Sequence, residues 1–122
     1  VNTDIVASME YACKVAGSKL IVVLGHEGCG AVKAACDGVE LGNITALLSN
    51  IQPAVDSVKA TVEGPYDSGN TSFVNATIAE NVKHTIAEIR NMSPILTELE
   101  TEGSIAIIGG VYQLASGVVE WL

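Results

Sequence analysis

A histidine and a cysteine, three residues apart, follow directly after an apolar run near the start of the chain. The run covers residues 20–24, and His26 and Cys29 lie in the segment Gly-His-Glu-Gly-Cys-Gly that comes next. Imidazole nitrogen and thiolate sulfur are both common zinc ligands. Open α/β sheets build their sites at the carboxyl ends of strands, which is where this pair would lie. The spacing therefore predicts His26 and Cys29 as metal ligands, with a structural histidine and a buried thiol as the alternative.

The other residues with reactive or charged side chains are predicted to have structural roles. Cys13 and Cys36 lie in helical patterns, and we expect buried, inert thiols there. Glu27 is predicted to be a solvated charge, because surface glutamates usually are, with a supporting contact to a metal ligand as the alternative. His84 has no partner at ligand spacing and is expected to be exposed or locally hydrogen-bonded. Five residues are interpreted as packing residues of a C-terminal hairpin or as solvated loop charges: Tyr112, Trp121, Asp37, Asp67 and Glu63.

The composition indicates one domain of 122 residues that can bury a core, with 48% apolar and 4% aromatic residues. The net charge of -8 argues against nucleic acid and against an anionic membrane surface as a partner. The low aromatic content disfavours base stacking, and no apolar stretch is long enough to span a bilayer. Three cysteines do not make a disulfide framework, which predicts a reducing, cytoplasmic setting.

Apolar periodicity and turn residues predict helices that alternate with apolar strands, and hence an α/β fold. The continuous run at 20–24 is typical of a strand covered on both faces, as in a parallel sheet. A strand over 104–108 continues over 111–114, and a last strand over 118–122 returns antiparallel. Gly109-Gly110 is expected to let the backbone bend or approach a neighbour closely. Such a sheet is thin for so much apolar surface, so either the helices cover an unusually small sheet or strands are missing on the N-terminal side.

Helices are predicted over residues 4–16, 31–36, 44–59 and 72–92, with a shorter one from Pro94 to Gly103. Thr3 or Asp4 is expected to cap the first of them, Asn43 the third and Ser93 the last. Pro53 is expected to kink the third helix or to split it in two. The apolar face of the first helix is assigned to four residues: Ile5, Met9, Ala12 and Ala16.

Several stretches, in order, resemble the C-terminal two-thirds of a β-class carbonic anhydrase. They are Ser-Met-Glu-Tyr-Ala at 8–12, the run at 22–34 with His26 and Cys29, Glu-Asn-Val at 80–82, and Ile-Ile-Gly-Gly-Val-Tyr-x-Leu-x-Ser-Gly at 107–117. The resemblance implies a single β-carbonic-anhydrase-like domain over residues 1–122, without its N-terminal strands. Its fold would be α/β, with a mainly parallel sheet flanked by helices and an antiparallel C-terminal strand.

The same resemblance implies a zinc site that this chain supplies in part. Members of the family bind one Zn²⁺ through Cys, His and Cys, and the last two match His26 and Cys29. The first cysteine belongs to a Cys-x-Asp-x-Arg motif, whose Asp and Arg orient the zinc-bound water. This chain contains no such motif, and its one arginine is Arg90. The implied site therefore has two metal ligands and no catalytic dyad within residues 1–122.

The implied function is zinc-dependent, reversible hydration of carbon dioxide to bicarbonate, carried by a partial catalytic domain that is inactive in isolation. Relatives of the fold that hydrolyse carbonyl sulfide or carbon disulfide are a variant within the same class. The alternative is a catalytically inactive carbonic-anhydrase-like module for assembly or regulation. Missing strands would leave an open sheet edge and an uncovered apolar face. We therefore expect a homodimer, a higher oligomer or a complex with a separate N-terminal fragment.

Overall fold

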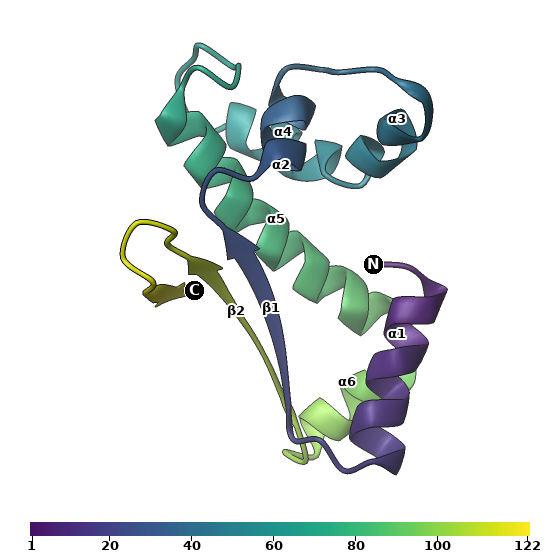
Figure 1. Ribbon diagram of the computed structural model, residues 1–122. Coiled ribbons are helices and arrows are strands. Elements are labelled where there is room, and N and C mark those ends of the chain that lie inside the picture. The colour runs from purple at the N-terminus through teal and green to yellow at the C-terminus, as the bar shows by residue number, and fades with distance from the viewer.

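Six α-helices, one π-helical turn and three strands form the computed structural model, which describes residues 1–122 (Figure 1). The helices are α1 (Thr3–Glu10), continued by the π-helical turn η1 (Tyr11–Val15), α2 (Gly30–Cys36), α3 (Gly42–Ser49), α4 (Gln52–Lys59), α5 (Thr71–Met92) and α6 (Pro94–Thr101). The strands are β1 (Leu20–His26), β2 (Ala106–Tyr112) and β3 (Val119–Trp121). None of the helices combines the length and the apolar character needed to cross a membrane.

The sheet has the order β1-β2-β3 and contains both kinds of strand pairing. Strands β1 and β2 are parallel, with a register that runs from Leu20 opposite Ala106 to His26 opposite Tyr112. Strand β3 pairs antiparallel with the end of β2, so that Trp121 lies opposite Gly110. The predicted α/β fold class, with a parallel pair and an antiparallel C-terminal strand, is confirmed.

Helix α5 lies along one face of the sheet, close enough to require glycine beneath it (Figure 1). A Cβ at Gly109 would lie 2.6 Å from Val82 Cγ1, and a Cβ at Gly25 would lie 2.8 Å from Val82 Cγ2. Strand β2 continues without interruption through Gly109 and Gly110, so of the two roles predicted for these glycines, a bend or a close approach to a neighbour, the close approach is confirmed. The first of these glycines therefore permits the close approach of a helix and does not end the strand.

Two hydrophobic clusters lie at opposite ends of α5. One joins α2, α3, α4 and the start of α5 around the fully buried Val55 and Phe73. The other joins η1, α6 and the sheet around Ile89 and Leu96. Figure 1 shows α2 to α4 beyond the carboxyl end of β1, and α1 and α6 at its other end. The β1 strand thus runs from the second cluster, which contains Ile21, toward the end of the sheet where α2 to α4 lie.

The face of β1 that points away from α5 is uncovered. Its alternate residues Leu20, Val22 and Leu24 are 51%, 42% and 51% exposed, whereas Ile21 on the other face is 8% exposed. The prediction that this strand is covered on both faces is therefore wrong for this chain. A continuous apolar run identifies a strand, but a second covering layer must come from elsewhere in the fold.

The outer edge of β1 is also unpaired. The Lys19 carbonyl accepts a hydrogen bond from the Ala106 N–H, and the Glu27 N–H donates to the Tyr112 carbonyl. Odd-numbered residues of β1 therefore direct their backbone groups at β2, and even-numbered residues direct theirs at the free edge. The expectation of an open edge and an uncovered apolar face matches what the structure shows.

Some predicted helix details are wrong. Asn2, not Thr3 or Asp4, caps α1, because its side chain accepts from the Ile5 N–H. Ile5 is exposed, and the buried residues of this segment are Val6 in α1 and Cys13 in the π-helical turn.

The other helices follow the predictions more closely. The predicted split at Pro53 is confirmed, because this residue lies in the first turn of a separate helix, α4. Leu41, not Asn43, occupies the capping position of α3. Ser93 caps α6 as predicted, since its hydroxyl accepts from the Leu96 N–H.

Candidate functional site

His26 is the last residue of β1, and its ring is oriented by the neighbouring peptide. The ring Nδ1 lies 2.9 Å from the carbonyl oxygen of Glu27. A carbonyl oxygen can only accept, so the tautomer that fits this contact carries its proton on Nδ1. The lone pair on Nε2 is then available to a metal ion. Zinc-binding histidines commonly donate their other ring N–H in this way, which fixes both the tautomer and the ring orientation.

Cys29 stands at the start of the next element. It is the N-cap residue of α2, it is partly buried, and its thiol is free. Gly28 between the two candidate ligands has a φ of +67°, a left-handed conformation that favours glycine. The chain can therefore turn sharply from the strand into the helix within three residues, which keeps His26 and Cys29 at the same end of β1.

A cavity of about 280 Å³ joins the two candidate ligands. His26 and Cys29 both contribute to its wall, and the remaining wall comes from β1, α2 and α5. Those other lining residues are Val23, Leu24, Gly25, Val32, Ile78, Asn81, Val82 and Thr85. The cavity is thus mostly apolar, and Leu24 and His26 in its wall belong to the residues whose backbone faces the free edge of β1. A segment that paired with that edge would lie beside the two candidate ligands.

No group of three or more His, Cys, Asp or Glu side chains is arranged to hold a metal ion. The other two cysteines do not approach the pair. Cys13 is buried in the cluster around Ile89 and Leu96, and Cys36 is buried beside Thr77, with Sγ 4.0 Å from Oγ1. Burial raises the pKa of the Cys36 thiol above its ordinary value, which disfavours the thiolate. The prediction that these two thiols are buried is confirmed.

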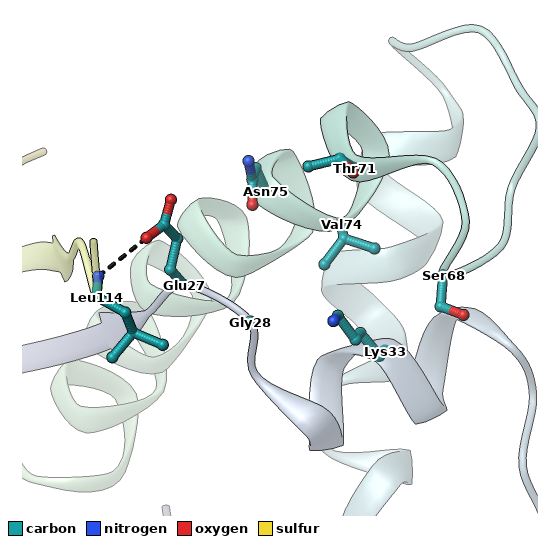
Figure 2. A pocket seen from close by; sticks show the side chains of 8 residues that line it. All are labelled: Glu27, Gly28, Lys33, Ser68, Thr71, Val74, Asn75 and Leu114. Atoms are coloured by element: carbon teal, nitrogen blue, oxygen red, sulfur yellow. Dashed lines mark hydrogen bonds between the residues drawn. The ribbon is translucent and has the colours of Figure 1, made fainter.

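Glu27 differs from its prediction as a solvated charge. It is half-buried, and its carboxylate Oε2 accepts a hydrogen bond of 2.9 Å from the backbone N–H of Leu114. Figure 2 shows this bond at the wall of a second cavity, of about 270 Å³, whose lining also includes Lys33, Thr71 and Asn75. The partner of Glu27 is a backbone group 87 positions away. No local pattern around a glutamate signals such a contact.

The remaining candidates lie outside the cavity of His26 and Cys29. His84 is partly exposed, and its Nε2 lies 3.7 Å from Oε1 of Glu88, as predicted for a locally paired side chain. Arg90 donates two hydrogen bonds to Glu100, of 2.8 and 2.7 Å. Asp37 is exposed but accepts a bond from the Ser68 N–H, which lowers the pKa of its carboxyl below the ordinary value.

The aromatic residues and loop acids have local roles. Tyr112 is half-buried in β2, whereas Trp121 is 60% exposed, and a Cβ at Gly110 would lie 3.1 Å from its Cε3. Asp67 accepts from the Gly69 N–H within the loop before α5, and Glu63 is exposed. None of these residues lines the cavity of His26 and Cys29, although Tyr112 lies opposite His26 in the sheet.

Comparison with known proteins places these residues in a family. The family model described as carbonic anhydrase matches residues 1–119. A carbonic anhydrase of Mycolicibacterium smegmatis is 32% identical over 120 residues, which are 98% of this chain and 57% of that protein. Carbonic anhydrase 2 of Mycobacterium tuberculosis is 33% identical over 117 residues, which are 96% of this chain and 55% of that protein. The chain therefore spans about half the length of the curated relatives that it matches.

Solved structures agree in fold. The β-carbonic anhydrase CafA of Aspergillus fumigatus superposes with a TM-score of 0.81 at 21% identity, over 100% of this chain and 57% of that chain. A tetrameric β-carbonic anhydrase of Sordaria macrospora gives a TM-score of 0.80 at 21% identity, over 100% of this chain and 61% of that chain. Together with the strand-to-helix turn that carries His26 and Cys29, the family match shows that this chain belongs to the β-carbonic anhydrases.

Proposed function

We propose that residues 1–122 form part of a zinc-dependent carbonic anhydrase that interconverts carbon dioxide and bicarbonate, with His26 and Cys29 as two of its three protein ligands. The observation that carries this proposal is the arrangement at the end of β1. The Nδ1 of His26 is engaged by the Glu27 carbonyl, so Nε2 is free, and His26 shares one cavity wall with Cys29. Membership of the family supplies the reaction class.

Bound zinc would supply a nucleophile at neutral pH, since the metal lowers the pKa of coordinated water to about 7 in the three-histidine class of carbonic anhydrases. The residues of this chain would hold the ion and exclude water around it, because most of the cavity wall is apolar. The free Nε2 of His26 fits a zinc ligand, and so does the thiol of Cys29. Arg90 is bound to Glu100 and is therefore not placed to orient a hydroxide at this site.

The third ligand is proposed to come from outside residues 1–122. The free edge of β1 can accept an added strand, and the uncovered face of Leu20, Val22 and Leu24 can be buried by another layer. A strand added at this edge would lie next to the cavity of His26 and Cys29. Either a second copy of the chain or a separate N-terminal fragment could provide it. The tetrameric Sordaria relative supports an oligomer. A monodisperse monomer of the native protein by light scattering would contradict this assembly.

A different class of function is a non-catalytic carbonic-anhydrase-like module for assembly or regulation. It is favoured by the presence of only two ligands, since catalytic zinc sites use three protein ligands. Under either proposal, the isolated chain is expected to be inactive.

The free state of all three cysteines supports a reducing, cytoplasmic setting. Activity assays of the complete protein should compare carbonyl sulfide and carbon disulfide with carbon dioxide as substrates.

The test uses the native protein and measures its intact mass under denaturing conditions together with its metal content. One zinc per complete site and a second polypeptide, or a longer chain, would support the enzyme. The variants His26→Ala and Cys29→Ser are expected to lose the zinc and the hydration activity, whereas His84→Ala retains both. Retention of zinc and activity in His26→Ala would overturn the proposal. A single 12.6 kDa species without zinc would favour the non-catalytic module.

A further inference from the structure

We propose that Glu27 is a positioning residue, whose carboxylate holds the His26 imidazole in the tautomer that presents Nε2. This inference rests on the proposed zinc site, because it assigns a role to a residue between the two candidate ligands. The role differs from that of a ligand. Glu27 lines the cavity shown in Figure 2, but it is absent from the wall of the cavity that His26 and Cys29 share.

Glu27 makes three hydrogen bonds, each through a different group. Its backbone N–H donates to the Tyr112 carbonyl at 2.9 Å, and its carboxylate accepts from the Leu114 N–H at 2.9 Å. Its carbonyl oxygen receives the Nδ1 of His26 at 2.9 Å. The first bond attaches the residue to the end of β2, the second attaches it to the β2–β3 connection, and the third links its carbonyl to the imidazole. Rotation of the Glu27 carbonyl would therefore remove the acceptor that selects the ring tautomer.

The β2–β3 connection is itself closed by hydrogen bonds and can serve as an anchor. The Gln113 N–H donates to the Val118 carbonyl at 2.8 Å, and the Gly117 N–H donates to the Gln113 carbonyl at 2.8 Å. Leu114 follows directly after the paired residue Gln113. A Cβ at Gly28 would lie 3.7 Å from Leu114 Cδ1, so the turn between His26 and Cys29 also lies close to Leu114.

The side-chain bond is needed because the following residue is permissive. Gly28 adopts a left-handed conformation and offers no side chain to restrain the peptide that precedes it. The backbone bond from the Glu27 N–H fixes one end of the residue, and the carboxylate bond to Leu114 supplies a second attachment. Together the two bonds hold the Cα of Glu27 in place, and with it the start of the peptide whose carbonyl oxygen receives the His26 Nδ1. A charged acceptor makes this bond stronger than one between neutral groups.

The experiment compares Glu27→Ala and Glu27→Gln with the parent chain in ¹⁵N-labelled protein, at a pH where both histidines are neutral. Long-range ¹H–¹⁵N spectra of the imidazoles report which ring nitrogen carries the proton. The parent is expected to show His26 as the Nδ1–H tautomer. Glu27→Ala is expected to shift His26 toward a mixture of tautomers and to speed exchange of the Leu114 amide about tenfold, as one hydrogen bond is lost. Glu27→Gln keeps an acceptor oxygen and is expected to retain the parent tautomer.

Two controls separate positioning from a general loss of structure. His84 reports from α5 in the same spectra and is expected to be unchanged in every variant. Glu63→Ala removes an exposed glutamate from the loop before α5 and should leave the His26 signals unchanged. An unaltered His26 tautomer in Glu27→Ala would overturn the inference, and so would an equal change in Glu27→Gln.

Addition of Co²⁺ to the same samples tests the proposed function separately. Charge-transfer absorption between Cys29 and the metal would show that the pair binds a divalent ion, and weaker absorption in Glu27→Ala than in Glu27→Gln would extend the inference to the loaded site. If the parent binds no Co²⁺ even when the third ligand is supplied by the complete protein, the zinc proposal fails. The coupling between Glu27 and the His26 ring is still decided by the metal-free spectra.

Discussion

The two faces of β1 have the same apolar character but different surroundings. On one face, Ile21 is buried against the cluster that contains Ile89 and Leu96. On the other, Leu20 and Leu24 are each 51% exposed. The difference shows that apolar composition specifies where a strand forms, while burial depends on which faces have a covering element. The open side of the strand lies next to the cavity of His26 and Cys29, because Leu24 lines that cavity.

The largest expected effect comes from truncating an apolar side chain on each face in turn. Ile21→Ala is expected to lower the free energy of unfolding by about 2–5 kcal/mol, because it leaves a cavity in a packed cluster. Leu24→Ala removes a side chain of similar size from the open face and is expected to cost less than about 1 kcal/mol. Urea unfolding of the monomeric chain measures both changes. Equal losses in the two variants would show that the open face is covered in solution.

A smaller effect is expected from adding a methyl group beneath α5. Gly109→Ala would place a Cβ 2.6 Å from Val82 Cγ1, so the helix or the strand must shift, at a cost of about 1–3 kcal/mol. Gly30→Ala is the matched control, because its Cβ would meet no atom within 4 Å. Thermal unfolding of the two variants compares the contacts. A Gly109→Ala protein as stable as the control would mean that α5 does not pack closely against the sheet at Gly109.

The smallest expected effect concerns an interaction that faces solvent. The guanidinium of Arg90 lowers the pKa of the Glu100 carboxyl below its ordinary value of 4.5 by hydrogen bonding. Glu100→Gln is therefore expected to cost no more than about 1 kcal/mol at neutral pH, because the pair is partly exposed and screened by water. A carboxyl with a depressed folded pKa stabilises the protein above its unfolded pKa.

That stabilisation is lost as the pH falls through the lowered pKa of Glu100 in the folded chain. The difference between the parent and Glu100→Gln should therefore shrink below a pH of about 4.5 and vanish in stronger acid. Glu98→Gln on the exposed side of the same helix controls for the change of net charge. A difference that stays constant down to strong acid would contradict the assignment.

Local patterns were sufficient for most elements and for the candidate ligands. The apolar run identified β1. The cap of α6 at Ser93 and the split between α3 and α4 at Pro53 follow from side-chain and ring geometry within a few residues. The buried face of the first helix was predicted less well, since it holds Val6 and Cys13 and Ile5 is exposed. The metal roles of His26 and Cys29 stay predictions that the zinc measurements will test.

Contacts between segments that are distant in the sequence could not be predicted from local patterns. The bond from the Leu114 N–H to Glu27 spans 87 positions, and the close approach of Val82 to Gly109 joins a helix to a later strand. Types and spacing of residues specified the fold class, the family resemblance and the His-x-x-Cys turn, because these depend on short-range geometry. Only the tertiary structure decided which face and which edge of β1 are open and that Glu27 is bonded to Leu114, because packing partners are set by the path of the whole chain.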